Sequence, residues 1–453
     1  MVRVIKLKKG LNLCIEGEAV PGNDKLVTSG EIAVVPDNYV GLLPKVTVRP
    51  GDKVKAGSPL MHDKNHETVQ VVSPVSGEVV AVERGERRKV LKIVVKNDGA
   101  GERVDFGIQD ADRMAPEALR GLLQAAGLWV YIKQRPYDII ADPDVAPRDI
   151  FVTAFDNAPL APRHAYDLLW SDDNTALQAG LKALARLTQG KVYVGIDEEA
   201  HATRLPDCVE PVVFKGAFPS CNAGVQLHHI APVNKGETVW TLCALDVVFI
   251  GRLLLTGSID LTRTVALCGS EVAHPTYVKA CPGTPVADMV GDNLVPAQHH
   301  RRFISGNVLT GLHIPSDGYL DAYHSQITVI PEGDETHDFL GWAMPGLRAL
   351  SLSRTFLSRW LPCRCENKPD ARIHGGERAI IMSGEYDKVF PMDILPEYLI
   401  KAIIAFDIDR MEQLGIYEVA PEDFAACEFV DTSKLPLQQI VRNGLDLLRK
   451  EMC

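Results

Sequence analysis

Aromatic rings and cations alternate in one short segment of the chain, residues 127–136. It carries Trp129 and Tyr131 just ahead of Lys133 and Arg135. Aromatic faces can hold a flat hydrophobic ring, and the cations can donate hydrogen bonds to carbonyl oxygens on it. Trp129, Tyr131 and Lys133 are therefore the candidate ligand contacts. The alternative, which we favour, is that Trp129 and Tyr131 share one face of a strand and fill a core.

A second candidate segment, residues 49–79, resembles the biotinyl/lipoyl hammerhead. Its Gly-Asp and Gly turns separate strand-length runs, and Ser73-Pro74 precedes the turn glycine Gly77. In carriers of that type, a lysine at the hairpin tip is acylated. Aligning on Ser73-Pro74 puts His66 at the tip and Lys64 two residues away. We therefore favour a scaffold over the alternative of a biotin or lipoyl carrier.

The usual motifs for phosphates, metals and nucleophiles are missing. Neither Gly-x-Gly-x-x-Gly nor Gly-x-x-x-x-Gly-Lys-Ser/Thr occurs, so nucleotide binding has no support. The pairs His228-His229 and His299-His300 would point to opposite faces of a strand, and Cys363-x-Cys365 lacks a second pair at zinc spacing. We assign no metal ligand and no catalytic residue.

Composition places the chain among ordinary globular proteins. It has 453 residues and a formal charge of −11, which excludes a strongly basic nucleic-acid binder. No apolar run approaches the roughly 20 residues of a membrane-spanning helix, because Asp246 and Arg252 interrupt the best one, residues 242–255. Residues 1–10 lack the apolar core of a signal peptide, and the ten cysteines form no dense framework. We expect a cytoplasmic chain with reduced thiols.

The elements that must position these residues follow from local patterns. Short β-rich runs between residues 31 and 95, separated by Pro and Gly, predict a small all-β module. A helix over 116–127, a strand over 149–154, a helix over 175–188 and a strand over 191–196 predict an α/β domain with a largely parallel sheet.

The second half of the chain changes from strands to helices. Strands are predicted over 237–240, 247–250 and 263–267, the last of them in an α+β module near 258–330. Helices are then predicted, over 393–414, 421–429 and 435–451.

Taken end to end, the sequence resembles the family of the A subunit of the bacterial sodium-translocating NADH:quinone oxidoreductase. The resemblance covers nearly the whole chain, and the block 375–396 is long and unusual in composition. The other segments that carry it are 6–13, Gly127-Leu-Trp129 with Arg135-Pro136, 227–233 with Thr238-Val-Trp240, and 338–342.

The resemblance implies an α/β and α+β multidomain fold related to the flavin-bearing subunit of respiratory complex I and to the cluster-bearing subunit of the Rnf complex. Its expected parts are an N-terminal segment and barrel-sandwich module (1–100), a Rossmann-like α/β domain (101–257), a β-grasp module of the SLBB type (258–330) and a helical domain resembling a degenerate ferredoxin-type region (331–453).

The resemblance also implies a function. The family's subunit lies peripherally on the cytoplasmic side of a six-subunit membrane pump that oxidises NADH, reduces quinone and exports sodium. Flavins and iron centres are expected in partner subunits, with none in this chain, which should have no activity alone. Its expected partners are above all the membrane subunits, and Trp129, Tyr131 and Lys133 become candidate quinone contacts. The sequence does not choose between ubiquinone and menaquinone.

The expected absence of iron clusters has its own support in the sequence. The cluster-bearing subunit of Rnf holds two four-iron clusters through runs of cysteines, because each iron needs a thiolate. Here Phe390 precedes Pro391 where a cysteine would stand, Cys427 remains alone, and Asp431 takes the next ligand position. These departures count against the alternative of an Rnf-type subunit with its own redox centre. We assign no ligand role to residues 218–224, which are more polar than the corresponding run of the family.

Overall fold

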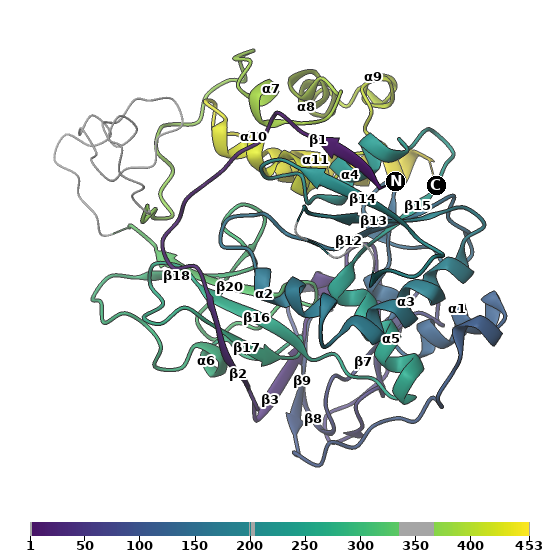
Figure 1. The fold of residues 1–453 in the computed structure, drawn as a ribbon. Helices are drawn as coiled ribbons and strands as arrows, with labels where there is room; N and C mark the ends of the chain where they lie inside the picture. Colours follow the sequence, from purple (N-terminus) through teal and green to yellow (C-terminus); the bar gives the residue numbers. More distant parts are fainter. Residues whose placement is uncertain (1, 199, 201–203, 335–366, 453) are drawn as a thin grey trace.

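A computed structural model of the chain describes residues 2–198, 200, 204–334 and 367–452. The Cys363-x-Cys365 motif and the segment 338–342 lie outside the described residues. Within the described part, no helix has both the length and the apolar character that crossing a membrane requires. Figure 1 shows the arrangement of the modules.

The N-terminal module consists of two small antiparallel sheets. Four strands pair in the order β3-β9-β8-β5 and three in the order β4-β6-β7. Their bounds are β3 (Glu31–Val34), β4 (Pro44–Val46), β5 (Lys53–Val54), β6 (Pro59–Asp63), β7 (Gln70–Val72), β8 (Gly77–Arg84) and β9 (Val90–Asn97). Gly77 has φ +154, and a Cβ there would lie 1.8 Å from the carbonyl oxygen of Lys96. The close pairing of β8 with β9 at this position therefore needs glycine. The predicted all-β module is confirmed.

A seven-stranded sheet in the order β1-β14-β13-β12-β15-β10-β11 forms the α/β domain. All neighbours from β1 to β15 pair in parallel, and the two pairings at the other edge, β15 with β10 and β10 with β11, are antiparallel. The strands are β1 (Arg3–Lys6), β10 (Lys133–Arg135), β11 (Ile139–Ile140), β12 (Ile150–Thr153), β13 (Val192–Ile196), β14 (Glu210–Lys215) and β15 (Val239–Cys243). The prediction of a largely parallel sheet is confirmed.

Helices cover both faces of this sheet (Figure 1). Ile150 and Val152 face the core beneath α3 and α5, whereas Phe151 faces the core beneath α4 and the C-terminal helices, as strand alternation requires. The helices of the domain are α1 (Pro116–Ala125), α2 (Arg163–Asp167), α3 (Asn174–Leu187), α4 (Ala223–Ile230) and α5 (Ala244–Thr256).

Residues 247–250, predicted as a strand, lie inside α5, so that prediction is wrong. The run is rich in β-branched and aromatic residues, which favour strands. However, α5 is buried on nearly all sides from Ala244 to Leu254, so its sequence shows no polar face that would reveal a helical period. The prediction for His228-His229 also changes, because both lie on α4 rather than on a strand.

The third module is a six-stranded sheet in the order β19-β18-β20-β16-β17-β2. Its elements are β2 (Val20–Leu26), β16 (Arg263–Cys268), β17 (Thr276–Ala280), α6 (Val286–Val290), β18 (Arg301–Ser305), β19 (Leu312–Ile314) and β20 (Gln326–Pro331). Two strands from the first 26 residues thus leave the N-terminal module: β1 pairs with β14 of the α/β sheet and β2 with β17 of this one (Figure 1).

Four short helices and one of 16 residues, α11, are described in the C-terminal region, which packs on the α4 face of the α/β sheet. They are α7 (Tyr386–Val389), α8 (Pro396–Ile404), α9 (Ile408–Gln413), α10 (Ala425–Val430) and α11 (Leu437–Met452). The helix predicted over 393–414 is two helices, because the backbone turns left-handed at Phe406, with φ +55. The last predicted helix is confirmed as α11.

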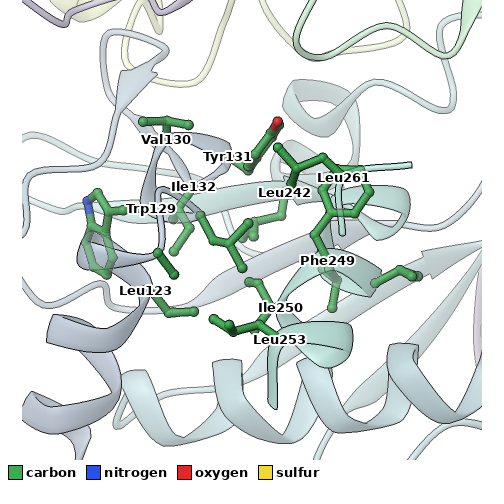
Figure 2. Packing of buried hydrophobic residues seen from close by; sticks show 14 of the residues in the cluster. Leu123, Trp129, Val130, Tyr131, Ile132, Leu242, Phe249, Ile250, Leu253 and Leu261 are labelled. Carbon is green, nitrogen blue, oxygen red and sulfur yellow. The ribbon is translucent and has the colours of Figure 1, made fainter. Parts of the chain in front are cut away.

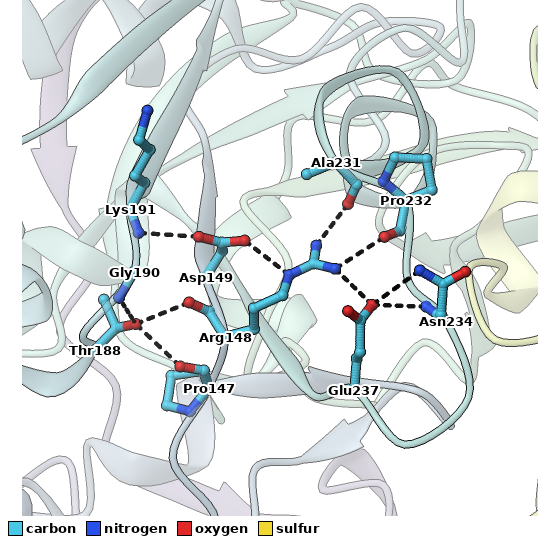
Figure 3. Close-up of polar contacts among 10 residues, drawn as sticks. All are labelled: Pro147, Arg148, Asp149, Thr188, Gly190, Lys191, Ala231, Pro232, Asn234 and Glu237. Atoms are coloured by element: carbon cyan, nitrogen blue, oxygen red, sulfur yellow. Dashed lines mark hydrogen bonds and ion pairs between the residues drawn. The ribbon is translucent and has the colours of Figure 1, made fainter.

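One arginine ties together the amino ends of three parallel strands (Figure 3). Arg148 donates to Asp149 (2.8 Å), to Glu237 (2.5 Å) and to the carbonyl oxygens of Ala231 (2.8 Å) and Pro232 (3.0 Å). Asp149 in turn accepts a hydrogen bond from the backbone N–H of Lys191 at 2.9 Å. These bonds hold the loops before β12, β13 and β15 together at the amino-terminal ends of the parallel strands.

Candidate functional site

Trp129 lies in the core of the α/β domain. It begins a short 3-10 turn (Trp129–Tyr131) rather than a strand, and its side chain has no exposed surface. The indole N–H donates to the carbonyl oxygen of Ala141 at 2.8 Å, and the ring meets Trp240 edge to face at 5.2 Å. Figure 2 shows it among buried apolar neighbours. The core alternative is confirmed for Trp129, although the strand it assumed is not there.

Tyr131 is also buried, at the point where three modules meet. Its ring contacts Phe249 of α5 at 5.5 Å and Tyr323 of the third module at 5.7 Å, and Tyr323 contacts Tyr39 of the N-terminal module at 6.1 Å. Burial raises the pKa of the Tyr131 phenol, so the ring stays neutral. Tyr131 therefore packs as part of the joint between modules.

Lys133 is the one predicted contact with partly exposed surface. Its ammonium lies 4.5 Å from the centre of the Tyr323 ring, a cation–π distance. The structure therefore brings Tyr131 and Lys133 together on Tyr323, whereas Trp129 contacts a separate set of residues. No observation here tests quinone contact, which stays a prediction for all three.

A buried ion pair lies beside Tyr131, and the sequence patterns did not predict it. Arg263 of β16 donates to Asp246 of α5 at 2.9 Å, and both side chains are less than 5% exposed. The guanidinium also lies 4.9 Å from the Phe249 ring. Burial raises the pKa of Asp246 to about 6, although the positive charge of Arg263 acts to lower it. The charge of Asp246 inside the apolar run 242–255 was a visible signal, but no sequence pattern identifies Arg263 as its partner.

The carboxyl ends of β12 and β15 form the topological switch point, where doubly wound sheets usually bind their ligands. Here the protein's own side chains meet at that point. Tyr166 of α2 places its hydroxyl 3.4 Å from the thiol of Cys243, at the end of β15. Gln226 of α4 lies 3.3 Å from Thr153, at the end of β12, and donates to the carbonyl oxygens of Ser220 and Cys221.

The fit around Gln226 is close. A Cβ on Gly195 of β13 would lie 2.0 Å from the Gln226 side-chain oxygen. The loop 218–224, to which we assigned no ligand role, supplies Ser220 and Cys221, both less than 9% exposed. Neighbouring strands, a helix and this loop therefore pack closely together at the carboxyl ends of β12 and β13.

Phe390, Cys427 and Asp431, which the sequence analysis compared with cluster ligands, are all buried in the C-terminal region. Phe390 and Cys427 belong to the same cluster of buried residues, and the Phe390 ring lies 5.0 Å from that of Phe424. Burial raises the pKa of the Cys427 thiol well above its usual value, which disfavours the thiolate that binds iron. Asp431 accepts hydrogen bonds from the backbone N–H groups of Ser433 and Leu435, at 3.0 and 2.8 Å.

A second charged cluster joins the α/β domain to the C-terminal region. Arg135, only 1% exposed, lies 3.4 Å from Glu422, 3.7 Å from Asp138 and 3.9 Å from Asp423. Burial, with repulsion from the other carboxylates, raises the pKa of Glu422 to about 7. Asn222, just before α4, donates to Asp423 at 3.2 Å and so links the two regions again.

The fold defines a class: a multidomain α/β protein with a barrel-sandwich module, a Rossmann-like α/β domain and a β-grasp module. Models of three domain families match the chain: the "NqrA N-terminal barrel-sandwich hybrid domain" over residues 5–98, the "NqrA second alpha/beta domain" over 114–259, and the "NQRA C-terminal domain" over 264–315.

Full-length relatives are named as the A subunit of the Na(+)-translocating NADH-quinone reductase. The protein of Vibrio parahaemolyticus is 34% identical, that of Pasteurella multocida 35% and that of Neisseria meningitidis 36%, each over 99% of this chain and 100% of the relative. The chain belongs to this family, the A subunit of the Na(+)-translocating NADH-quinone reductase, which confirms the resemblance seen in the sequence.

Proposed function

We propose that this chain is the peripheral subunit of a sodium-translocating NADH–quinone reductase that holds no redox centre and acts by contact with its neighbours. It lies on the cytoplasmic side, docks on the membrane subunits, and leaves electron transfer to flavins and iron centres held by those partners. The complex reduces quinone and exports sodium, whereas the isolated chain has no activity.

One observation supports the proposal: this chain's own side chains contact one another at the carboxyl ends of the parallel strands and in the core around Cys427. Gln226 and Tyr166 occupy the carboxyl ends of the parallel strands, and Phe390 lies against Phe424 in the core that also buries Cys427. Among the described residues, that core contains two cysteines, Cys221 and Cys427, whereas a four-iron cluster needs four ligands.

The cofactor content of the purified chain tests this proposal. We expect a colourless protein with neither flavin nor iron in stoichiometric amount, measured by visible absorption, by fluorescence of the acid extract and by iron assay. One flavin or one iron cluster per chain would contradict the proposal and favour the Rnf-type alternative.

Quinone contact by Trp129, Tyr131 and Lys133 is a separate part of the proposal. Lys133 is partly exposed and can donate a hydrogen bond to a quinone carbonyl, whereas Trp129 has no exposed surface and would act through packing. In the assembled complex, Lys133→Met should raise the KM for a short-chain quinone while NADH oxidation by an artificial acceptor stays normal.

Lys191→Met is the control for this measurement, because Lys191 is an exposed lysine of the same domain that pairs with Glu210. An unchanged quinone KM for Lys133→Met, or an equal rise for Lys191→Met, would remove Lys133 from the quinone site.

Attachment to the membrane should run through partner subunits rather than lipid headgroups. A chain of formal charge −11 is repelled by the negative potential of anionic lipids. In flotation assays, the isolated chain should stay with the buffer when mixed with anionic vesicles, yet bind membranes that carry the other subunits. Equal binding to both would contradict docking through partners.

A further inference from the structure

The tip of the hairpin between β6 and β7 carries a histidine whose two ring nitrogens both face carboxylates. His66 is 31% exposed at its side chain, and its Nδ1 lies 3.3 Å from Oδ2 of Asp63. Asp63 is 8% exposed, and its Oδ1 accepts hydrogen bonds from the backbone N–H groups of Leu43 at 3.0 Å and Asn65 at 3.3 Å. Asp63 is thus held rigidly and fixes the orientation of the imidazole.

The other nitrogen points out of the N-terminal module toward the loop that follows β11. His66 Nε2 lies 3.6 Å from Oδ1 of Asp142 and 3.8 Å from Oδ2 of Asp144. The backbone of this loop is held in place, because the Asp142 N–H donates to the Gln134 side chain at 2.8 Å and the Asp144 N–H to the Asp142 carboxylate at 2.9 Å. One donor atom from each of His66, Asp142 and Asp144 lies within 4.8 Å of the others.

We propose that His66, Asp142 and Asp144 bind a divalent metal ion of the first transition row and so clamp the N-terminal module to the α/β domain. One imidazole nitrogen and two carboxylates are a donor set suited to such ions. With its Nδ1–H donated to Asp63, the imidazole presents the Nε2 lone pair to the ion, which is the usual arrangement of carboxylate, histidine and metal.

The geometry needs only a small adjustment. Donors that share one ion at about 2.1 Å lie roughly 3.0 to 3.4 Å apart, slightly closer than the separations found here. The Asp144 side chain is 85% exposed, so it can move inward at little cost. An adjoining cavity of about 170 Å³, lined by His66, Asp142, Asp63 and Tyr137 among others, leaves room for the water molecules that would complete the coordination.

The competing explanation needs no metal: a protonated imidazole would pair with the same three carboxylates. Titration of the full-length chain with Co²⁺ at pH 7.5 under reducing conditions distinguishes the two. Co²⁺ suits this test because its visible spectrum separates nitrogen and oxygen ligands from thiolates, and the chain has ten cysteines.

We expect one Co²⁺ per chain by equilibrium dialysis, with d–d bands and no sulfur-to-metal charge-transfer band. His66→Gln should abolish this binding, and Asp144→Asn should weaken it about tenfold or more. Because Asp144→Asn alters an exposed side chain, this variant should fold and can test the site even if His66→Gln does not fold. The matched control is His300→Gln, at a surface histidine that lies 2.8 Å from a carboxylate of its own, that of Asp334; it should bind as the unaltered chain does.

A thermal melt supplies a second readout, since an ion that binds only the folded state stabilises it. Saturating Co²⁺ should raise the Tm of the unaltered chain and of His300→Gln, but not that of His66→Gln. Absence of saturable binding, a thiolate spectrum, or equal binding by Asp144→Asn would overturn the metal site and leave the protonated imidazole as the explanation.

Discussion

Charged side chains with almost no exposed surface lie where the modules of this protein meet. Asp246 and Arg263 join the α/β domain to the third module, and Arg135 joins it to the C-terminal region. Burying an unpaired charge is very unfavourable, so each group depends on partners from the other side of its interface. Such pairs favour one arrangement of the modules over others.

Glu422 makes the stability of this joint depend on pH. Its folded-state pKa of about 7 lies above the ordinary value of 4.5, so the folded chain holds a proton that the unfolded chain releases first. Its contribution to stability is complete below about pH 4.5 and is lost as the pH rises through 7. Because 41% of the side chain is exposed, solvent should weaken the effect.

Glu422→Gln should therefore remove part of this pH dependence. The free energy of unfolding, measured by urea titration between pH 4.5 and 8, should match that of the unaltered chain at the acid end and exceed it at pH 8. A variant whose difference from the unaltered chain stays constant across this range would show that Glu422 titrates normally in the fold.

At the scale of elements, α3 and α5 pack with almost no space between their backbones. A Cβ on Gly251 would lie 1.8 Å from the carbonyl oxygen of Ala176, and one on Gly180 would lie 2.3 Å from that of Val247. Backbone atoms cannot move aside as a flexible side chain does. Each glycine therefore sets the distance between the two helices.

Gly251→Ala should lower the free energy of unfolding by about 1 to 3 kcal/mol, the usual result of overpacking a core. The control is Gly121→Ala in α1, where no atom lies within 4 Å of the added Cβ. That change should stabilise the chain by about 0.5 to 1 kcal/mol, because alanine favours helix over glycine. Denaturant titration measures both, and equal effects would mean that the helices separate freely.

The end of α8 places a bulky residue where glycine is usual. The N–H groups of Phe406 and Asp407 donate to the carbonyl oxygens of Ile403 and Ala402, and Phe406 has φ +55, the pattern of a Schellman cap. Phe406 is 70% exposed, so little packing offsets the strain.

Phe406→Gly should therefore give a more stable chain than Phe406→Ala, by about 1 kcal/mol, because only glycine adopts this conformation without a penalty. Thermal and urea unfolding of the two variants provide the comparison. If alanine is the more stable of the two, the left-handed turn carries no strain.

The elements predicted correctly are those with a strong local signal. The strands of the N-terminal module and helix α1 follow from turn residues and periodicity. By contrast, α5 lacks a polar face and Phe406 gives no helix-stop signal, so both were misjudged. The pairs that build the sites, such as His66 with Asp142 or Asp246 with Arg263, come from separate elements, and one sequence alone does not reveal which elements meet.

At the scale of the whole molecule, the N-terminal segment connects two sheets that belong to different modules. After β1 the segment first contacts the α/β domain and the C-terminal region, and residues 15–19 then lie against the third module, where Ile15 and Ala19 pack with Tyr277 in a small core (Figure 1). Gly17 lies so close to Gly269 that a Cβ would come within 2.3 Å of its carbonyl oxygen. The segment therefore acts as a strap across the molecule rather than as part of the barrel-sandwich module.

A chain that begins at Ser29 lacks this strap and should lose stability in both sheets at once. Removing β1 and β2 exposes the hydrogen-bonding edges of β14 and β17, and free edges of this kind promote association between molecules. We expect a lower Tm and concentration-dependent oligomers in size-exclusion chromatography, whereas a control chain that begins at Arg3 keeps both strands and should behave normally.

Because the barrel-sandwich sheets keep all their own strands, hydrogen exchange in β8 and β9 should change little while that in β14 and β17 accelerates. Uniform acceleration throughout the chain would show that the modules fold as a single unit, and unchanged exchange in β14 and β17 would show that the strap contributes nothing to either sheet.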